Sequence, residues 1–238
     1  MIKKYLSSVF NRIKVESNLF KIYLIIKEKK FLIKSKKDNT YSQYGEDQFF
    51  KKYFKGRKGT YIDIGASHPF IISNTYLLYK NGWRGVTVEP IDYLHKRHKQ
   101  LRPRDIAIKS LVGPIKGNMM FYQMIPSVLS TSDLKTMNEL VKDGYKVRNK
   151  IPMMVETLSS IYTQYLYGQS VDLLSIDVEG ADIDVLKSND WSAMNPELIV
   201  CEVNDQNCNK VDIYLRQYSY LKIKSFGCNN IYKKNSID

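Results

Sequence analysis

The stretch G-T-Y-I-D-I-G-A-S, residues 59–67, constrains the fold of this chain more than any other. Residues 60–64 are a run of β-branched and aromatic side chains between two glycines, which predicts a short buried strand. Asp63 lies near the end of that strand, Gly65 ends the strand, and a helix is expected soon afterwards. A strand, an acid, a glycine turn and a helix together form the crevice in which open α/β sheets bind nucleotide-like ligands.

The glycine content of this turn restricts the ligand. A pyrophosphate needs several glycines so that backbone N–H groups can approach it, as in G-x-G-x-x-G or G-x-x-x-x-G-K-[ST]. Here the turn has Gly65 alone, and no lysine follows in the phosphate-gripping position. An acid at the strand tip suits a ligand with a cationic end, such as an ammonium or a sulfonium. The turn therefore favours S-adenosylmethionine over NAD or ATP.

A second acid follows the next expected strand. Residues 85–90, G-V-T-V-E-P, read as another buried run that ends in Glu89. This acid lies slightly beyond the roughly 20-residue spacing at which a carboxylate accepts the ribose hydroxyls in doubly wound folds. Either acid alone would be read more simply as a helix cap or a surface charge. Two acids at two successive strand tips favour a nucleoside site.

Charge is spread unevenly along the 238 residues, a length that fits one domain plus an appendage. The net charge is +13, but residues 1–37 hold eleven cations against Glu16 and Glu28, which gives them +9 and leaves +4 for the rest. A nucleic-acid-binding face is therefore not required.

The three cysteines show no C-x-x-C spacing, which argues against a zinc site or a disulfide framework and predicts a cytoplasmic protein.

Residues 1–40 alternate cations with apolar residues and predict a basic amphipathic helical segment, distinct from a domain at 41–238. No run in it approaches the roughly 20 apolar residues that span a bilayer. Lys21 interrupts the densest apolar run, so the segment is also a poor signal peptide. Two interpretations stay open. Residues 1–37 could rest on the anionic lipid of the inner membrane surface, or the helix could pack on the domain or on a partner.

The rest of the chain alternates expected strands with expected helices, which predicts a doubly wound α/β domain. The later strands are expected at residues 104–110, 118–124, 171–177 and 198–203, with a closing antiparallel pair at 220–224 and 230–232. Residues 126–154 are the least regular part, with a polar helix ending near Val141. A long connection of this kind often serves as a lid or a binding loop.

A pair of acids marks the strand at 171–177. In S-I-D-V-E-G, Asp177 and Glu179 lie two apart in extended chain, so their carboxylates should point to the same side. With Asp63, Glu89 and Glu202 they make five acids at predicted strand tips, along the edge where the crevice should lie. Such clustering is costly unless it serves a ligand or shifts a pKa. The alternative is that Asp177 and Glu179 only cap the next helix.

These stretches, taken in order, resemble the FkbM-type S-adenosylmethionine-dependent methyltransferases over most of residues 42–204. The matching segments are S-Q-Y-G-E-D (42–47), Y-I-D-I-G-A-S-H-P (61–69), S-N-T (73–75), G-W-R-G-V-T-V-E-P (82–90), F-Y (121–122), T-L (157–158), L-S-I-D-V-E-G-A-D-I-D-V-L (174–186), D-W (190–191) and the strand to Glu202. The resemblance implies a class I methyltransferase fold, which is Rossmann-like, with a mostly parallel sheet and a closing antiparallel strand.

The resemblance also implies roles for individual residues. Asp63, Gly65 and Ala66 would surround the methionine half of S-adenosylmethionine, Glu89 would bind the ribose, and Asp105 or its neighbours would lie near adenine. The other expected cofactor-binding residues are Gln43, Asp47, Ser67, Pro90 and Ile106, and the expected acceptor-binding residues are Asn74 and Glu202. Many members carry Asn where this chain has Asp105. Residues 126–154 match little, so the choice of substrate is expected to lie there.

Methyl transfer from a sulfonium is an in-line displacement, and most of its acceleration should come from positioning the acceptor against the methyl group. A general base typically adds about 10²–10⁴-fold, and His68, Asp177 and Glu179 are the candidates. The resemblance favours a hydroxyl acceptor on a sugar, a glycan or a small metabolite.

The sequence also bears on three other functions. A nucleic-acid methyltransferase would usually carry an Asn/Asp-Pro-Pro-aromatic loop, which the sequence lacks. Intact acids at the strand tips argue against an inactive, membrane-attached scaffold. The site residues are expected to bind no metal, although the carboxylates and His68 are of the ligand type that suits a hard cation, and their spacing does not decide metal dependence.

Overall fold

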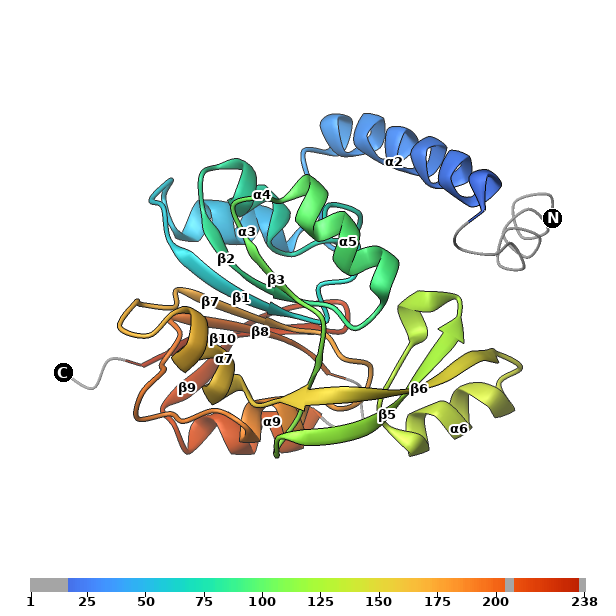
Figure 1. Ribbon diagram of the computed structural model, residues 1–238. Coiled ribbons are helices and arrows are strands. Elements are labelled where there is room, and N and C mark those ends of the chain that lie inside the picture. Colours follow the sequence, from blue (N-terminus) through green and yellow to red (C-terminus); the bar gives the residue numbers. More distant parts are fainter. Residues whose placement is uncertain (1–16, 204–207, 236–238) are drawn as a thin grey trace.

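Seven strands form the central sheet of the computed structural model, which describes residues 17–203 and 208–235 (Figure 1). In spatial order the strands are β3 (Ile106–Ile108), β2 (Arg84–Val88), β1 (Thr60–Ile64), β7 (Leu173–Ile176), β8 (Leu198–Glu202), β10 (Asn229–Lys234) and β9 (Tyr220–Phe226). The first five run parallel, and β10 pairs antiparallel with both of its neighbours. The predicted doubly wound, mostly parallel sheet with an antiparallel closing pair is confirmed.

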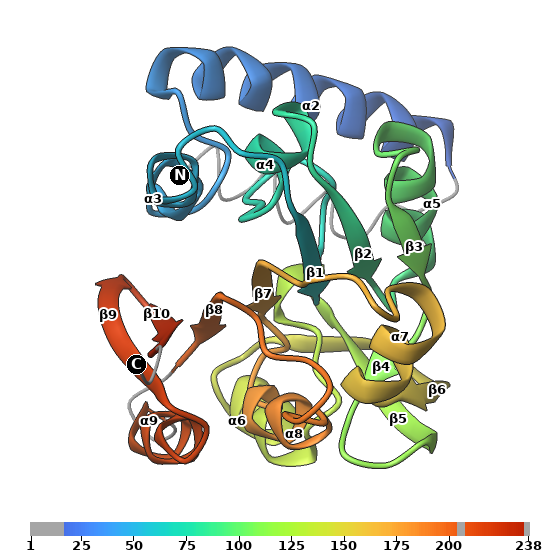
Figure 2. The same ribbon diagram turned by 90° about the vertical axis from the view of Figure 1, so that its left-hand side faces the viewer.

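Helices cover both faces of this sheet, as Figure 2 shows. One face is covered by α3 (Glu46–Tyr53), α4 (Tyr76–Lys80) and α5 (Asp92–Leu101), and the other by α7 (Leu158–Tyr165), α8 (Asp182–Lys187) and α9 (Cys208–Arg216). Because successive side chains of a strand point to opposite faces, β1 contributes to both cores. Tyr61 packs with Phe50 and Trp83 on one side, and Ile62 packs with Leu174 on the other. This double burial explains the continuous apolar strands in the sequence.

A second, three-stranded sheet is inserted between β3 and α7. It consists of β4 (Leu111–Val112), β6 (Lys146–Glu156) and β5 (Gly117–Ile125) in that order, with the short 3-10 helix η1 (Ser127–Leu129) and α6 (Leu134–Lys142) between β5 and β6. The expectation that residues 126–154 are irregular was wrong for β6. Three cations and Pro152 interrupt its apolar alternation, and its order comes from pairing along β5 rather than from its own pattern.

Other predicted boundaries differ by a few residues. The strand expected at 104–110 is limited to Ile106–Ile108, because the Asp105 N–H donates to the Arg102 carbonyl in a turn just before it. The helix expected from Ser73 begins at Tyr76, where the Ser73 hydroxyl accepts the Tyr76 N–H.

A long helix, α2 (Asn18–Asp38), crosses above α4 and α5 (Figures 1 and 2). Phe31 and Leu32 pack against a buried cluster that includes Phe70 and Leu77. The Glu28 carboxylate lies 3.0 Å from His68 Nε2, and Arg97 also donates to it. This face of α2 therefore packs on the α/β body, while residues 1–16 of the predicted segment lie outside the described residues. Among the described helices, none combines the length and the apolar character needed to cross a membrane.

Candidate active site

The parallel register brings four predicted site residues to one edge of the sheet. Pairing of β1 with β2 and β7, and of β7 with β8, places Gly65, Glu89, Asp177 and Glu202 in one row, each at or just after a strand end. This carboxyl edge is where open α/β sheets bind ligands. The residue types at the strand ends and the topology of the sheet therefore indicate the same place.

Gly65 allows the turn after β1 to lie against β7. Its φ of 75° is in the left-handed region that favours glycine, and a Cβ built on it would lie 1.8 Å from the carbonyl oxygen of Asp177. Any side chain here would push the two strand ends apart. Ser67 follows at φ 48°, so the chain turns sharply and exposes backbone groups beside the edge.

Glu89 joins the ends of β1 and β2. Its Oε2 accepts the Ser67 N–H at 2.9 Å, and its Oε1 accepts the Ile91 N–H at 2.7 Å. Burial raises the pKa of this carboxyl to about 8, although both backbone N–H groups favour the charged form. Each carboxylate oxygen has a second lone pair, so Glu89 can still accept from a ligand hydroxyl.

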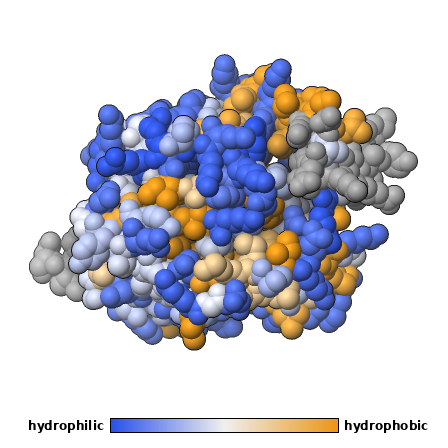
Figure 3. Space-filling view, viewed as in Figure 1, coloured by the Kyte–Doolittle hydropathy of each residue, from blue (hydrophilic) through white to orange (hydrophobic). Residues whose placement is uncertain are grey.

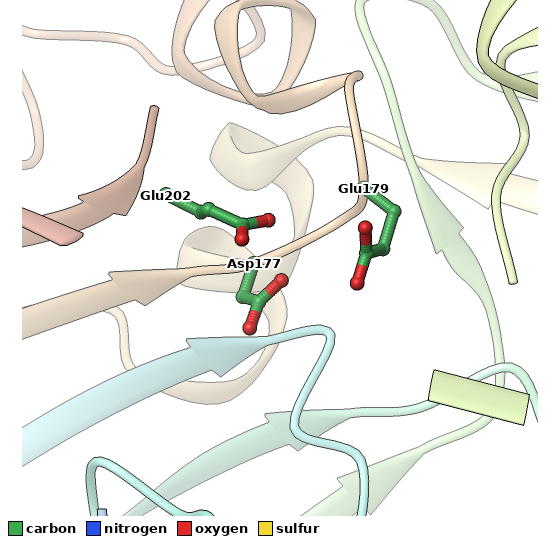
Figure 4. A group of neighbouring side chains, drawn as sticks. All are labelled: Asp177, Glu179 and Glu202. Carbon is green, nitrogen blue, oxygen red and sulfur yellow. The ribbon is translucent and has the colours of Figure 1, made fainter. Parts of the chain in front are cut away.

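Three carboxylates gather at the ends of β7 and β8, and we call Asp177, Glu179 and Glu202 the acid triad. One oxygen from each lies within 4.8 Å of the others, and Figure 4 shows all three side chains reaching into one space. Burial, together with the charges of Glu202 and Asp182, raises the pKa of Glu179 to about 8. The pKa of Asp177 is also raised, first by burial and then by Glu202 and Glu179. Asp177 and Glu179 therefore have a high affinity for protons, and the three carboxylates together could attract a cation.

The turn that carries Glu179 is fixed from two sides. Asp182 accepts the N–H groups of Val178 and Gly180, both at 3.3 Å, and burial raises its own pKa to about 7. From the inserted segment, the Thr131 hydroxyl donates to the Glu179 carbonyl at 2.8 Å. Glu179 itself has a φ of 54°, an uncommon conformation for a residue other than glycine. The inserted segment thus holds a strained residue of the acid triad in place.

A cavity of about 430 Å³ lies over this edge, within the size range of small-molecule sites. Its floor is the strand ends, including Gly65, Glu89 and the acid triad. Residues 127–132 and Phe121 of the inserted segment form one wall, and Leu24 and Lys27 of α2 form part of another. The expectation that residues 126–154 help to form the binding site is consistent with this wall.

Ser110 is a cavity residue that the sequence reasoning missed. It follows β3, is 3% exposed, and its hydroxyl is a buried polar atom that has no hydrogen-bond partner within the described part of the chain. A buried hydroxyl left unpaired is costly, so such an atom is usually satisfied by water or a ligand. The one sequence signal that could have indicated Ser110 is its position after the third strand. The family resemblance implied Asp105, before that strand, as the residue near adenine instead.

Most of the predicted site residues line the cavity. The described lining includes Gln43, Gly65, Ser67, His68, Glu89, Pro90, Asp177, Glu179 and Glu202. Three others lie outside this lining. Asp63 accepts the Thr75 hydroxyl at 2.5 Å and has a pKa raised by burial, Asn74 donates to the Ser175 hydroxyl at 3.3 Å, and the Ala66 N–H donates to the Val88 carbonyl at 3.1 Å.

The adenine assignment to Asp105 and Ile106 requires a correction. Asp105 lies at the amino-terminal end of the sheet, where it forms a fully buried ion pair with Arg102 at 2.7 Å and accepts the Gly85 N–H. Ile106 is 39% exposed and lies outside the cavity lining. A residue at the start of a strand lies at the opposite edge from one at its end, so neither side chain can reach the ligand crevice.

Two further candidates have structural contacts. His68 lines the cavity, but its Nδ1 accepts the Phe70 and Ile71 N–H groups, at 3.4 Å and 3.2 Å, and its Nε2 faces Glu28. Burial lowers the pKa of His68. With both ring nitrogens engaged, His68 fits a link between α2 and the turn after β1 better than a general base. Asp47 lies outside the cavity lining, where it accepts the Tyr41 N–H at 2.7 Å.

The acid triad is also the one group of three or more metal-ligand side chains found within the described residues. Carboxylate oxygens are the ligands of hard divalent cations. His68, which was considered as a further ligand, is not part of this group and is oriented toward Glu28. The triad alone could therefore hold a cation.

The chain matches one known protein family. A model of the FkbM methyltransferase domain matches residues 63–222. Among solved structures, the chain is similar to a crystal structure from Pyrococcus horikoshii that is described as a candidate RNA methyltransferase. That likeness has 9% identity and a TM-score of 0.40 over 80% of this chain and 82% of the other, which is too weak to bear on the substrate. The search of curated proteins found no match. Because the matched residues span well over half of the sequence, the chain belongs to the FkbM methyltransferase family.

Proposed function

We propose that this methyltransferase transfers the methyl group of S-adenosylmethionine to a hydroxyl oxygen of a sugar, a glycan or a small metabolite. The observation that carries the proposal is the acid triad, which lies at the cavity floor beside the glycine turn. A hydroxyl must lose its proton as it is methylated, and carboxylates with raised pKa values are suitable acceptors for that proton.

The cavity floor fits the proposed cofactor in three respects. The sharp turn at Gly65 and Ser67 offers backbone groups to an amino acid end, and Glu89 has lone pairs to spare for ribose hydroxyls. The unpaired Ser110 hydroxyl after β3 supplies a polar partner on the side where adenine is expected. When bound, S-adenosylmethionine supplies an electrophilic methyl group on a positively charged sulfur, a charge that the nearby acids favour.

Glu179 is the residue that we propose as the general base. It lines the cavity, its pKa is raised to about 8, and the fixed turn holds its backbone in place. One of its carboxylate oxygens would take the proton from the acceptor hydroxyl while the acceptor oxygen bonds to the methyl carbon and the sulfur–carbon bond breaks. Burial, together with the negative charges of Glu202 and Asp182, raises the proton affinity of this base.

Thermal unfolding in the presence of S-adenosylhomocysteine, S-adenosylmethionine or NAD tests the cofactor. A ligand at about 100 times its dissociation constant should stabilise the protein by roughly 2.7 kcal/mol, which is a shift of a few degrees at this size. We expect a shift with both adenosyl compounds and none with NAD. The shift should be lost in a folded Glu89→Gln variant, because the amide places an NH₂ donor where ribose hydroxyls and backbone N–H groups need acceptors. Lack of any shift in folded wild-type protein would favour an inactive scaffold.

Transfer of a labelled methyl group tests the acceptor class. Sugars and polyols, amine analogues in which one hydroxyl is replaced, and single-stranded RNA and DNA would each be offered at equal concentration. Label should appear in the hydroxyl compounds as a base-stable ether. Preferential labelling of nucleic acid would contradict the proposal and support the nucleic-acid alternative. Parallel reactions with EDTA and with added Mg²⁺ would show whether the acid triad works with a cation or as a base.

The raised pKa of Glu179 predicts the pH dependence. A base must be ionised to accept a proton, so kcat/KM should rise with pH and level off above about 8. The inflection will belong to the coupled acid triad rather than to Glu179 alone. A raised carboxyl pKa also means that the folded protein holds protons which the unfolded chain releases, so the stability of the ligand-free protein should fall as the pH rises from about 4.5 to about 8. A rate that falls over the same range would contradict the role as base.

A further inference from the structure

The helix α2 packs on the domain through one face and carries a row of apolar residues on another face that is not packed on the described part of the domain. Glu28, Phe31, Leu32 and Ser35 lie on the packed face, where Glu28 is 8% and Ser35 is 3% exposed. On the other side, Leu19, Ile22, Ile26 and Ile33 form what we call the outer stripe. Their spacings of three, four and seven residues place all four on one side of the helix.

The outer stripe is well exposed. Leu19 is 65%, Ile22 54%, Ile26 47% and Ile33 72% exposed. Figure 3 shows apolar surface in the region of α2 next to strongly hydrophilic side chains. Single exposed apolar residues are common on proteins, but four in register along one helix mark an interaction surface.

Lysines border the outer stripe on both sides. By helical geometry Lys29 and Lys36 lie along one border and Lys30 and Lys37 along the other, and all four are exposed. The helix thus presents an apolar line between two cationic lines. This is the pattern of helices that lie in the surface of an anionic bilayer, with the apolar residues among the acyl chains and the cations at the headgroups.

We propose that α2 docks the protein on an anionic lipid surface through the outer stripe and its bordering lysines. Charge decides against a second copy of the chain as the occupant, because two such faces brought together would oppose lysine to lysine. Residues 1–37 carry +9 in total, which adds to the attraction for anionic lipid. The proposal does not depend on the identity of the methyl acceptor.

Docking would set the position of the cavity. Leu24 and Lys27, from the same helix, form part of the cavity wall. The outer stripe and the residues that line the cavity therefore lie on different sides of the same helix. The cavity would lie about one helix diameter, roughly 10–12 Å, from the lipid surface.

Flotation of the full chain with vesicles tests the proposal. Vesicles of phosphatidylcholine alone are compared with vesicles that also contain phosphatidylglycerol. We expect flotation with the anionic vesicles only, and weaker flotation at high salt. The double variant Ile22→Glu/Ile26→Glu should reduce binding by about tenfold or more, because it puts two charges where the proposal places apolar side chains among the acyl chains. Both positions are exposed, so the variant should fold, which circular dichroism and thermal unfolding would verify.

Two further variants make the test specific. Ile115→Glu changes a 78% exposed isoleucine outside α2 and should leave binding unchanged. Replacement of Lys29, Lys30, Lys36 and Lys37 by serine should remove the preference for anionic lipid. Failure of the wild-type chain to float, or equal flotation of the Ile22→Glu/Ile26→Glu variant, would overturn the proposal. So would a dimer in solution that the same double variant dissociates while lipid binding is absent.

Discussion

Replacement of Glu179 by glutamine should lower kcat by about 10²–10⁴-fold, the range that a general base typically contributes. The amide keeps the size of the side chain but cannot accept the proton of the acceptor hydroxyl. It also removes a charge that burial and Glu202 disfavour, so the variant should be as stable as the wild type or more stable at alkaline pH. Steady-state kinetics, with thermal unfolding in the same buffer, separates the two effects.

A matched control comes from an exposed glutamate. Glu139 lies on α6 with half of its side chain exposed and only a loose contact to Lys135, at 3.8 Å. Glu139→Gln should leave kcat unchanged within a factor of about two, since surface substitutions of this kind have small effects. The pH-dependent rise in kcat/KM should vanish in Glu179→Gln and persist in Glu139→Gln. If Glu179→Gln keeps near wild-type turnover, another group takes the proton and the assignment fails.

Replacement of Gly65 by alanine should destabilise the protein by more than about 4 kcal/mol, at the upper end of single-residue effects. The new Cβ would lie 1.8 Å from the backbone oxygen of Asp177, and backbone of neighbouring strands cannot yield as a flexible side chain can. Relief requires the ends of β1 and β7 to separate, which would also displace the acid triad. Unfolding in denaturant measures the loss, and any protein that folds should bind S-adenosylhomocysteine poorly.

The variant Gly144→Ala is the control that distinguishes the cost of the steric clash from the cost of the left-handed backbone conformation. It also has a positive φ, of 90°, but an added Cβ would meet nothing within 4 Å. Gly144→Ala should therefore cost only about 1–2 kcal/mol, the penalty of the left-handed conformation itself. Equal losses in the two variants would show that the contact with Asp177 does not matter.

The central sheet could be predicted because its strands are buried on both faces. Residues 60–64 coincide with β1, and the expected strand at 85–89 is displaced by one residue from β2. Since parallel strands align their ends, the sequence alone predicts that the acids at the ends of β2, β7 and β8 lie together. The row of Gly65, Glu89, Asp177 and Glu202 follows from those strand ends.

The remaining differences arise from contacts that are distant in the sequence. The family resemblance implied that Asp105 lies near adenine, but only the fold reveals that it lies at the far edge, paired with Arg102. His68 was considered a base because it follows the glycine turn, and its partner Glu28 is 40 residues away. Ser110 carries no motif, and its interest comes from being buried without a hydrogen-bond partner among the described residues. Such features depend on packing, which local pattern does not encode.

The position of β10 has a consequence for the synthesis of the protein. Although β10 follows the other described strands in the sequence, it lies inside the sheet, between β8 and β9, and Asn229 at its start donates to the buried Glu46 carboxylate of α3 at 2.6 Å. While a ribosome is still adding residues 229–234, the edge of β8 has no neighbour and α3 lacks this contact. Native pairing must therefore wait until these residues have left the exit tunnel. A premature stop before residue 229 would remove this strand and leave an open, apolar sheet edge available for aggregation.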